Sequence, residues 1–596
     1  MLDKIKEVLP GTGTKTPAGP VPVDEKAVDN TTVTQKATTS SSDLEKAGQS
    51  DGEIGGPEYQ AGVQEIEAAL TVWTKWHLVA AYGMIWLIYF ITSIEEVVVR
   101  TFSPFVTSSF SSHSLTATTS IMSSIIAGLT KLPLSKILDI WGRPQGMALM
   151  LLVWTLGFIM MAACKNVFTY AAAQVFSTVG SQGISYCLTV FIADTSSLKS
   201  RGLMLAFATS PYIVTTWIGG PMGDSLVRGA GWRWGFGIFS IITPVVVLPL
   251  IILFWVQLVR AKKQGLVSYR RPEISPRATF RFFVDMDLLG ILFLAAGMAL
   301  ILIPLSIGFK QKLGWKDPKI IAMTVVGAVL LVIFVAYERF LAPVNFVPFK
   351  ALSDRTILFA GLMLFFLFFN SAVWGSYFTS MLMVVWNLSV TKATYISNIY
   401  RVGSCFSALV LGYLMRVTGR FKWVALYYGM PLMLLGVGLM IHFRRPDAEI
   451  GYVVMTQIFV AFAGGPLVVA AEMAFMAPVT HQNLASILAI LDLFSSIGYA
   501  VGATVSGAIW TGCFPDALRR HLPEGANIEY IYSSIYTQLG YPVGTEIRKG
   551  ISWAYADAQR YMVITSTCAL AVGWGCVLLW RDIKVKEKKQ VGGNVA

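Results

Sequence analysis

The sequence predicts an all-α integral membrane protein with about fourteen membrane-spanning helices. The chain is 55% hydrophobic and only 14% charged, whereas soluble domains are about a quarter charged. Apolar runs of about 20 residues, the length that crosses a hydrocarbon core about 30 Å thick, recur along the chain between short polar breaks. Helices are the expected spanning element, because each helix satisfies its own backbone hydrogen bonds in lipid.

The predicted spans follow the apolar runs in chain order. They lie near residues 77–96, 116–136, 145–163, 168–192, 203–223, 234–257, 287–307, 320–338, 356–380, 391–414, 423–442, 451–472, 484–510 and 561–580. If the N-terminus is cytoplasmic, the cytoplasmic loops hold about twice as many Lys and Arg as the outer loops. Both termini are therefore expected in the cytoplasm.

The first 70 residues differ from the rest in composition. They are rich in Thr, Ser, Gly and Pro, and they hold twelve acidic residues against six lysines. Such a segment buries too little apolar surface to fold alone, so residues 1–70 are predicted to be a disordered acidic cytoplasmic tail. Residues 581–596 form a second cytoplasmic tail on the same topology.

Two loops share one spacing. The pattern is Ser135-x-x-x-Asp139-x-x-Gly142-Arg143 after the second span and Gly412-x-x-x-Arg416-x-x-Gly419-Arg420 after the tenth. A repeat at corresponding places indicates an internally duplicated transporter. Gly permits a sharp reversal, and Arg can bridge to a helix C-terminus or a carboxylate. The candidate gate residues are thus Asp139, Gly142, Arg143, Gly419 and Arg420; the alternative is two ordinary basic loops.

Ionisable residues inside the spans are a stronger indication of function, because inserting one at mid-bilayer costs at least about 2.5–3.5 kcal/mol of free energy. They are Glu95, Glu96, Lys131, Arg401, Glu472 and Asp492. A carboxyl group that is protonated when desolvated and ionised when hydrated can couple proton flow to a conformational change. Glu95 or Glu96, or else Asp492, is the proton-coupling candidate, with Arg401 or Lys131 as a partner. Solvated helix ends, or a purely structural ion pair, are the alternatives.

Polar residues on two helices predict a cavity. Asp492, Ser495, Ser496 and Tyr499 share one face of the thirteenth span at i, i+3, i+4 and i+7. Arg401 and the neighbouring Tyr400 lie on the tenth. The substrate-binding candidates are Tyr377, Tyr400, Arg401, Ser495 and Tyr499. Packing between helices is the alternative for each aromatic residue.

A connection of about fifty residues, 511–560, precedes the last span and falls outside the cell on this topology. Its tyrosines and arginines, Tyr541, Arg548 and Tyr555 among them, suit a bulky, oxygen-rich ligand. A packed loop that only joins two helices is the alternative.

The two Gly-Arg loops, with the run Gly219-Gly220-Pro221-Met222-Gly223 and the run Trp232 to Phe236, resemble signatures of the major facilitator superfamily. The resemblance to its fourteen-span branch implies two six-helix bundles, 71–257 and 356–580, around a segment 258–355 with a basic cytoplasmic loop and two extra helices. Departures from the pattern occur at Ser135, Ile140 and Gln174, where the family usually has Gly, a basic residue and Arg.

A narrower resemblance rests on the segments 193–202, 210–213, 505–510 and the long connection 511–560. These are similar to fungal siderophore-iron transporters. The resemblance implies proton symport of ferric siderophores, mainly hydroxamates, into the cell by alternating access, for iron uptake. It implies a monomer in the plasma membrane, or in a vacuolar or vesicular one, whose partners are the siderophore, protons and lipid, with no nucleic acid. No cofactor and no protein-held metal are expected, since the iron travels inside the substrate.

Three other functions are alternatives to siderophore transport. A drug:proton antiporter would share the fourteen spans but not the long connection. A receptor would be favoured by a structured tail. An enzyme is disfavoured, because the sequence holds no phosphate-binding loop, nucleophile elbow or His-rich cluster.

Overall fold

The computed structural model describes residues 61–109, 116–266, 280, 284, 287–307, 314–342, 352–479, 483–533 and 535–585. The chain divides into two units, Met1–Glu53 and Ile54–Ala596, and every described residue belongs to the second. Across those residues the regular structure consists of helices, and no strand occurs. The predicted all-α membrane fold is confirmed.

Long helices account for all fourteen predicted spans. The first six positions are α3 (Lys75–Ser109), α4 (Thr116–Ile140), α5 (Arg143–Ala163), α6 (Val167–Thr195), the pair α7 (Leu198–Thr209) and α8 (Tyr212–Arg228), and α9 (Trp232–Lys263). The next two are α11 (Leu288–Ile307) and α12 (Pro318–Phe340), which follows the short η3 (Gly314–Lys316). The last six are the pair α14 (Arg355–Gly375) and α15 (Phe378–Val385), α16 (Val390–Thr418), the π-helical turn η4 (Val424–Gly429) with α17 (Met430–Phe443), α18 (Ile450–Met476), α19 (Leu484–His521) and α22 (Glu546–Leu578).

Within the described part of the chain, eleven of these helices or helix pairs are long and apolar enough to cross a membrane. The other three predicted spans coincide with α4, α11 and α16. The helix α11 is apolar along its length and carries no charged residue. The helices α4 and α16 carry charged residues in mid-sequence, Lys131 and Arg401.

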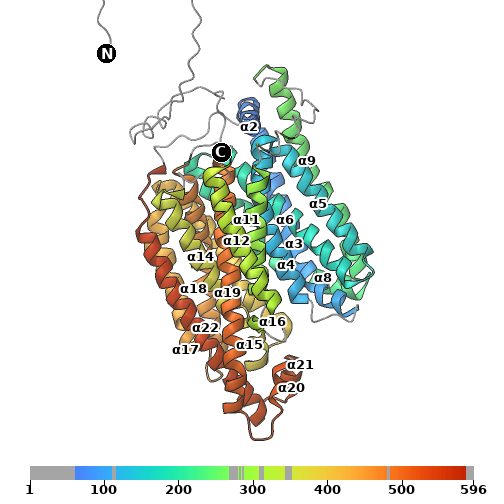
Figure 1. Cartoon of the computed structure of the whole chain (residues 1–596), viewed down its shortest axis with the longest axis vertical. Coiled ribbons are helices and arrows are strands. Elements are labelled where there is room, and N and C mark those ends of the chain that lie inside the picture. The colour runs from blue at the N-terminus through green and yellow to red at the C-terminus, as the bar shows by residue number, and fades with distance from the viewer. Residues whose placement is uncertain are drawn as a thin grey trace, which may run out of the picture. The chain divides into compact units, whose positions relative to one another are not determined.

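Helix contacts repeat between the two halves of the chain. The helix α3 packs against α8 and α9, and α14 packs likewise against α19 and α22. The helix α5 packs against α6 and α9, as α17 does against α18 and α22. The contact of α4 with α6 is matched by that of α16 with α18. The chain therefore folds as two copies of one six-helix arrangement (Figure 1), as the repeated loop pattern predicts.

The two halves meet along a seam, in which three helix contacts are the most extensive. On one side α4 packs against α19, and on the other α16 packs against α7 and α8. The extra helix α11 contacts both α4 and α19, so it covers the first of these contacts, and α12 packs on α11. We call the end of the bundle that carries α2 the α2 end, and the end that carries α20 and α21 the α20 end (Figure 1).

Glycines set the closest helix approaches within each half. A Cβ added at Gly498 of α19 would lie 2.2 Å from the Phe365 carbonyl oxygen of α14, and one at Gly502 would lie 2.5 Å from that of Phe369. In the other half, a Cβ at Gly157 of α5 would lie 2.3 Å from a backbone nitrogen of α6. Small residues let helix backbones pack this closely where lipid provides no hydrophobic drive.

Part of the segment that was predicted to be disordered is helical. Residues 61–72 form α2 (Ala61–Val72), which packs against α9 and α4. Its apolar face is buried, with Leu70 and Trp73 at 0% and 1% exposure. Gly62 lies against the Leu138 carbonyl, and Glu65 Oε1 is 2.8 Å from Lys262 Nζ. The sequence did not predict this short amphipathic helix, because the composition of the surrounding segment is acidic and polar. The rest of the predicted tail, most of the basic loop and residues 586–596 lie outside the described residues.

The connection before the last span is also shorter than predicted. The helix α19 continues to His521, well past the end of its apolar run. The helix α22 begins at Glu546, well before the start of its own apolar run. Between them lie two short helices, α20 (Ile528–Ser533) and α21 (Ile535–Gly540). The two long helices stay in contact there: a Cβ added at Gly550 would lie 2.4 Å from the His521 carbonyl. Helix packing continues beyond the membrane, and hydropathy alone does not detect it.

The tight α14–α19 contact predicts a stability difference between two glycines of one helix. Replacing Gly498 by Ala should lower the thermal unfolding midpoint of the purified protein, because overpacking a core site costs about 1–3 kcal/mol. The matched change Gly512→Ala should not, since a Cβ there meets nothing within 4 Å. Equal midpoints for both variants would contradict this packing.

Candidate functional site

The seam between the halves holds an ion pair from α3 to α16. Arg401 Nη2 lies 2.9 Å from Glu96 Oε1, and Nη1 lies 3.2 Å from Oε2. This two-point geometry is the strong form of an arginine–carboxylate contact. The ring of Tyr212, on α8, lies 5.1 Å from the guanidinium carbon. About a third of each charged side chain remains exposed, at 28% and 33%.

A second ion pair joins α4 to α19 across the same seam. Lys131 Nζ lies 2.9 Å from Asp492 Oδ2, with 14% and 29% of the two side chains exposed. Here the cation belongs to the N-terminal half and the carboxylate to the C-terminal half, the reverse of the first pair. The predicted α19 stripe does face α4, because Ser496 Oγ would lie 2.8 Å from a Cβ at Gly128.

The two pairs lie at different depths. Arg401 precedes the turn glycine Gly419 by 18 residues, and Lys131 precedes Gly142 by 11. At 1.5 Å per helical residue, these positions are roughly 27 and 16 Å from the turns at the α2 end. Two ion pairs at different depths thus join the halves. Each ion pair must break if the two halves separate at its depth.

Glu95 occupies a different environment from its neighbour Glu96. Its side chain is 4% exposed, inside the N-terminal half, where Trp154 Nε1 donates a hydrogen bond of 3.0 Å to Oε1. The other oxygen, Oε2, has no hydrogen-bond partner among the described residues. Adjacent residues on a helix point about 100° apart, which separates a carboxyl group in the protein interior from one at the seam.

Glu472, on α18, is partly buried and takes part in no hydrogen bond or ion pair within the described ranges. Its helix packs against α19, which carries Asp492. Of these two carboxyl groups of the C-terminal half, Asp492 is paired with a cation, whereas Glu472 has no such partner among the described residues.

The predicted substrate-binding residues do not all lie together. Arg401 is at the seam, and Tyr400 beside it packs on Gly464 of α18, where an added Cβ would lie 2.6 Å from the hydroxyl. Ser495 donates to the Leu491 carbonyl of its own helix at 3.1 Å, and Tyr499 is 53% exposed. Tyr377 stacks on Trp510, with ring centroids 4.0 Å apart, near the α20 end.

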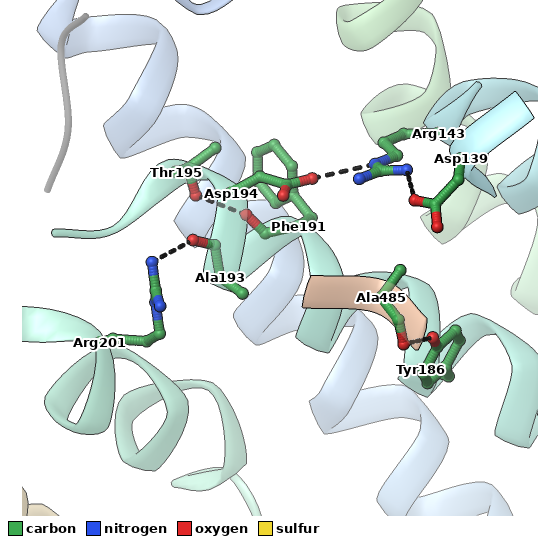
Figure 2. Close-up of polar contacts among 9 residues, drawn as sticks. All are labelled: Asp139, Arg143, Tyr186, Phe191, Ala193, Asp194, Thr195, Arg201 and Ala485. Carbon is green, nitrogen blue, oxygen red and sulfur yellow. Dashed lines mark hydrogen bonds and ion pairs between the residues drawn. The ribbon is translucent and has the colours of Figure 1, made fainter. Parts of the chain in front are cut away.

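At the α2 end the first Gly-Arg loop forms a buried charge network (Figure 2). Arg143 Nη1 donates to Asp139 Oδ1 at 2.8 Å, and Nε donates to Asp194 Oδ2 at 3.0 Å. All three side chains are at most 3% exposed. Gly142 has φ 119°, a conformation that favours glycine, so it makes the reversal between α4 and α5. The network ties α4, α5 and the end of α6 together.

The spacing of the loop residues predicts Asp139 and Arg143 as gate residues, but it does not predict Asp194. Asp194 lies in the last turn of α6, beyond the predicted span 168–192, and the only signal for it in the sequence is its place in the segment 193–202 that carries the family resemblance. Arg201 in that segment is fully buried and donates from Nη2 to the Ala193 and Ser196 carbonyls at 2.7 and 3.2 Å. It closes the turn from α6 to α7 (Figure 2).

The second Gly-Arg loop contacts a different element. Gly419 has φ 71° and ends α16. Arg420 Nη1 lies 3.1 Å from Asp582 Oδ2, and both side chains are 47% exposed. Lys422 Nζ donates to the Leu578 and Trp580 carbonyls at the end of α22. The repeated motif thus makes a buried network in one half and a solvated one in the other.

The halves also touch directly at the α2 end. The Tyr186 hydroxyl of α6 donates to the Ala485 carbonyl at the start of α19 (Figure 2). Gly412 of α16 packs on the backbone of α7, where an added Cβ would lie 3.2 Å from the Gly202 oxygen. Tyr186 and Ala485 are buried. These contacts close the seam near the gate residues.

The tyrosines and arginine predicted in the long connection are mostly used for packing. Arg548 is 3% exposed and donates to the Val384 and Gln538 carbonyls at 3.0 and 2.6 Å. The Tyr555 hydroxyl donates to Gln538 Oε1 at 2.8 Å. Tyr541 accepts from Arg548 through its carbonyl at 3.3 Å. In this structure the segment matches the packed-loop alternative: its buried polar groups bind α15, α21 and one another.

Known proteins share this sequence and fold. Residues 85–391 match the model of the Major Facilitator Superfamily. The chain is 50% identical to "MFS siderochrome iron transporter 1" of Ajellomyces capsulatus, over 90% of this chain and 92% of that one. It is 38% identical to "Siderophore iron transporter mirB" of Emericella nidulans, over 98% of both chains.

Among solved structures, the crystal structure of a bacterial homologue of iron transporter ferroportin matches with a TM-score of 0.51 and 11% identity. The match covers 84% of this chain and 99% of that one, and it supports the fold alone. The comparisons indicate a transporter and not an enzyme, as the sequence predicts. The chain belongs to the major facilitator superfamily and, within it, to the family of fungal siderochrome iron transporters.

Proposed function

We propose that this protein imports ferric siderophores, preferably of the hydroxamate type, by proton symport with alternating access. The names of relatives that match nine-tenths or more of the chain support the substrate class. The Glu96–Arg401 pair carries the mechanism, because it is a charged, hydrated contact that joins the two halves.

Arg401 supplies what a ferric hydroxamate requires of its site. Such a chelate presents oxygen atoms that accept hydrogen bonds, and a guanidinium group offers donors in a planar fork. The Tyr212 ring beside it adds an aromatic face for a bulky ligand. Substrate that binds Arg401 must compete with Glu96 for the same donors.

This competition couples the substrate to the proton. A part-buried Glu96 that has lost Arg401 is left as an unpaired carboxylate, which is costly, and taking up a proton relieves the cost. Protonation of Glu96 in turn frees Arg401 for the substrate. Each ligand therefore favours binding of the other by the same factor, as linkage requires.

Glu95 and Asp492 are the other proton carriers in this proposal. Glu95 is enclosed and forms no ion pair with any described residue, so a proton bound there neutralises it without breaking such a pair. Asp492 must release Lys131 first. Glu96 is the preferred carrier, because it alone combines access to water, a cation from the opposite half and a position beside Tyr212.

The direction of transport follows from the assigned orientation. With both termini cytoplasmic, the α2 end faces the cytoplasm, and contacts such as Tyr186 with Ala485 close the seam on that side. Substrate then enters from the α20 end, from outside the plasma membrane. The gate network of Asp139, Arg143 and Asp194 holds α4, α5 and α6 as one body during the change.

Uptake of radioactive iron tests the proposed function. In cells that lack other siderophore carriers, expression of this protein should give uptake of ferric hydroxamates that a protonophore abolishes. Resistance to toxic compounds without iron uptake would instead indicate a drug antiporter. Surface-expressed protein that moves none of a panel of ferric siderophores would contradict the proposal.

The variant Glu96→Gln should separate binding from coupling. A neutral amide leaves Arg401 free for substrate, so exchange of labelled for unlabelled siderophore should persist. Uphill accumulation should fall to near equilibrium, because the proton site is lost. The matched variant Asp582→Asn removes a carboxylate from the half-exposed Arg420 pair and should accumulate substrate normally. Normal accumulation by the Glu96→Gln protein would exclude Glu96 as the carrier.

A further inference from the structure

A buried arginine at the α20 end has no carboxylate partner within the described residues. Arg444 follows α17 and is 2% exposed. Its Nη1 donates to the Trp374 carbonyl at 2.9 Å and to Gln559 Oε1 at 2.6 Å. Its guanidinium carbon lies 4.3 Å from the Phe378 ring centroid. These contacts fix the side chain, and both hydrogens of one nitrogen are used.

The remaining edge of this guanidinium has no protein partner among the described residues. Neither Nε nor Nη2 of Arg444 has a hydrogen-bond partner in the described part of the chain. These two nitrogens point their hydrogens the same way and form the fork that grips an anion. A buried cation without counter-charge is costly, and fixed donors without acceptors add to that cost.

Two neighbouring side chains add further unused donors. Gln559 Nε2 and Trp374 Nε1 are buried and also lack acceptors among the described residues. Gln559 and Trp374 are 0% and 6% exposed, so bulk water does not satisfy them. All the unpaired groups of this donor cluster, Arg444, Gln559 and Trp374, are hydrogen-bond donors.

Nearby acids do not supply the missing charge. Asp447 and Glu449 follow Arg444 in the chain, but both are exposed and neither forms an ion pair with it in the described structure. The carbonyl at the end of α14 carries partial negative charge, and Nη1 already uses it. A water molecule would accept hydrogen bonds but would leave the positive charge uncompensated.

We propose that the donor cluster binds a small monovalent anion, either a halide such as chloride or a small carboxylate such as formate. The anion would accept from the Nε and Nη2 edge of Arg444. Because Trp374 lies on α14, Phe378 on α15 and Gln559 on α22, it would tie these helices to the end of α17. The site lies within the C-terminal half, away from the seam ion pairs, and does not depend on the proposed substrate.

Thermal unfolding of the purified full-length protein in detergent tests this site. Sodium chloride and sodium formate would each replace the sodium salt of a bulky sulfonate at constant ionic strength. A ligand that binds only the folded state raises the midpoint as its concentration exceeds its Kd. A rise with chloride alone assigns a halide, and a rise with formate alone assigns a carboxylate. No rise with either anion would overturn the proposal in favour of buried water.

The variant Gln559→Glu tests whether the anion binds at the donor cluster itself. It places a permanent carboxylate beside Arg444, so it should weaken the response to added anion by about tenfold or more without unfolding the protein. The control Arg445→Gln removes the adjacent, partly exposed cation and should keep the full response. An undiminished response in Gln559→Glu would also overturn the proposal, because the anion would then bind elsewhere. Replacing chloride by bromide should place an anomalous scattering peak at the donor cluster.

Discussion

Charges inside a bilayer must be compensated, and in this protein the compensation comes from the opposite half of the molecule. Glu96 meets Arg401 and Asp492 meets Lys131, and in each pair one residue lies before α11 and the other after α12. Neither half could carry its share of these charges alone without a cost of several kcal/mol. The halves are therefore held in register by contacts that a ligand with its own charge or donors can replace. In the proposed mechanism, transport is an exchange of ion-pair partners at the seam.

The gate network has a different physical role. Arg143 lies between two carboxylates, deeply buried, so its contacts are expensive to break and suit a rigid body. The seam pairs are partly hydrated and cheaper to exchange. The corresponding Arg420 loop is exposed and bonds to the segment after α22. The two copies of the sequence motif thus make different contacts, and Tyr186 with Ala485 joins the halves near the N-terminal copy.

Hydropathy and loop spacing predicted the class, the helix positions and the repeat, because those depend on local composition and period. They did not predict which distant charges meet: 305 residues separate Glu96 from Arg401, and only packing brings them together. The helix α2 and the extended ends of α19 and α22 were missed because their apolar faces are short or mixed with polar residues. The sequence did not predict a role for Arg444, because a single arginine at the end of a span is expected to be exposed to solvent. Its burial depends on Trp374 and Gln559, which come from other helices.

The central claim is that proton and substrate bind together because both break the Glu96–Arg401 pair. The direct measurement is the Kd of a ferric hydroxamate for the purified protein across pH. Linkage to one proton predicts that affinity rises as pH falls, by up to about tenfold per pH unit, and that Glu96→Gln binds with little dependence on pH. An affinity that is independent of pH in the unaltered protein, or an unchanged pH dependence in the variant, would contradict the account.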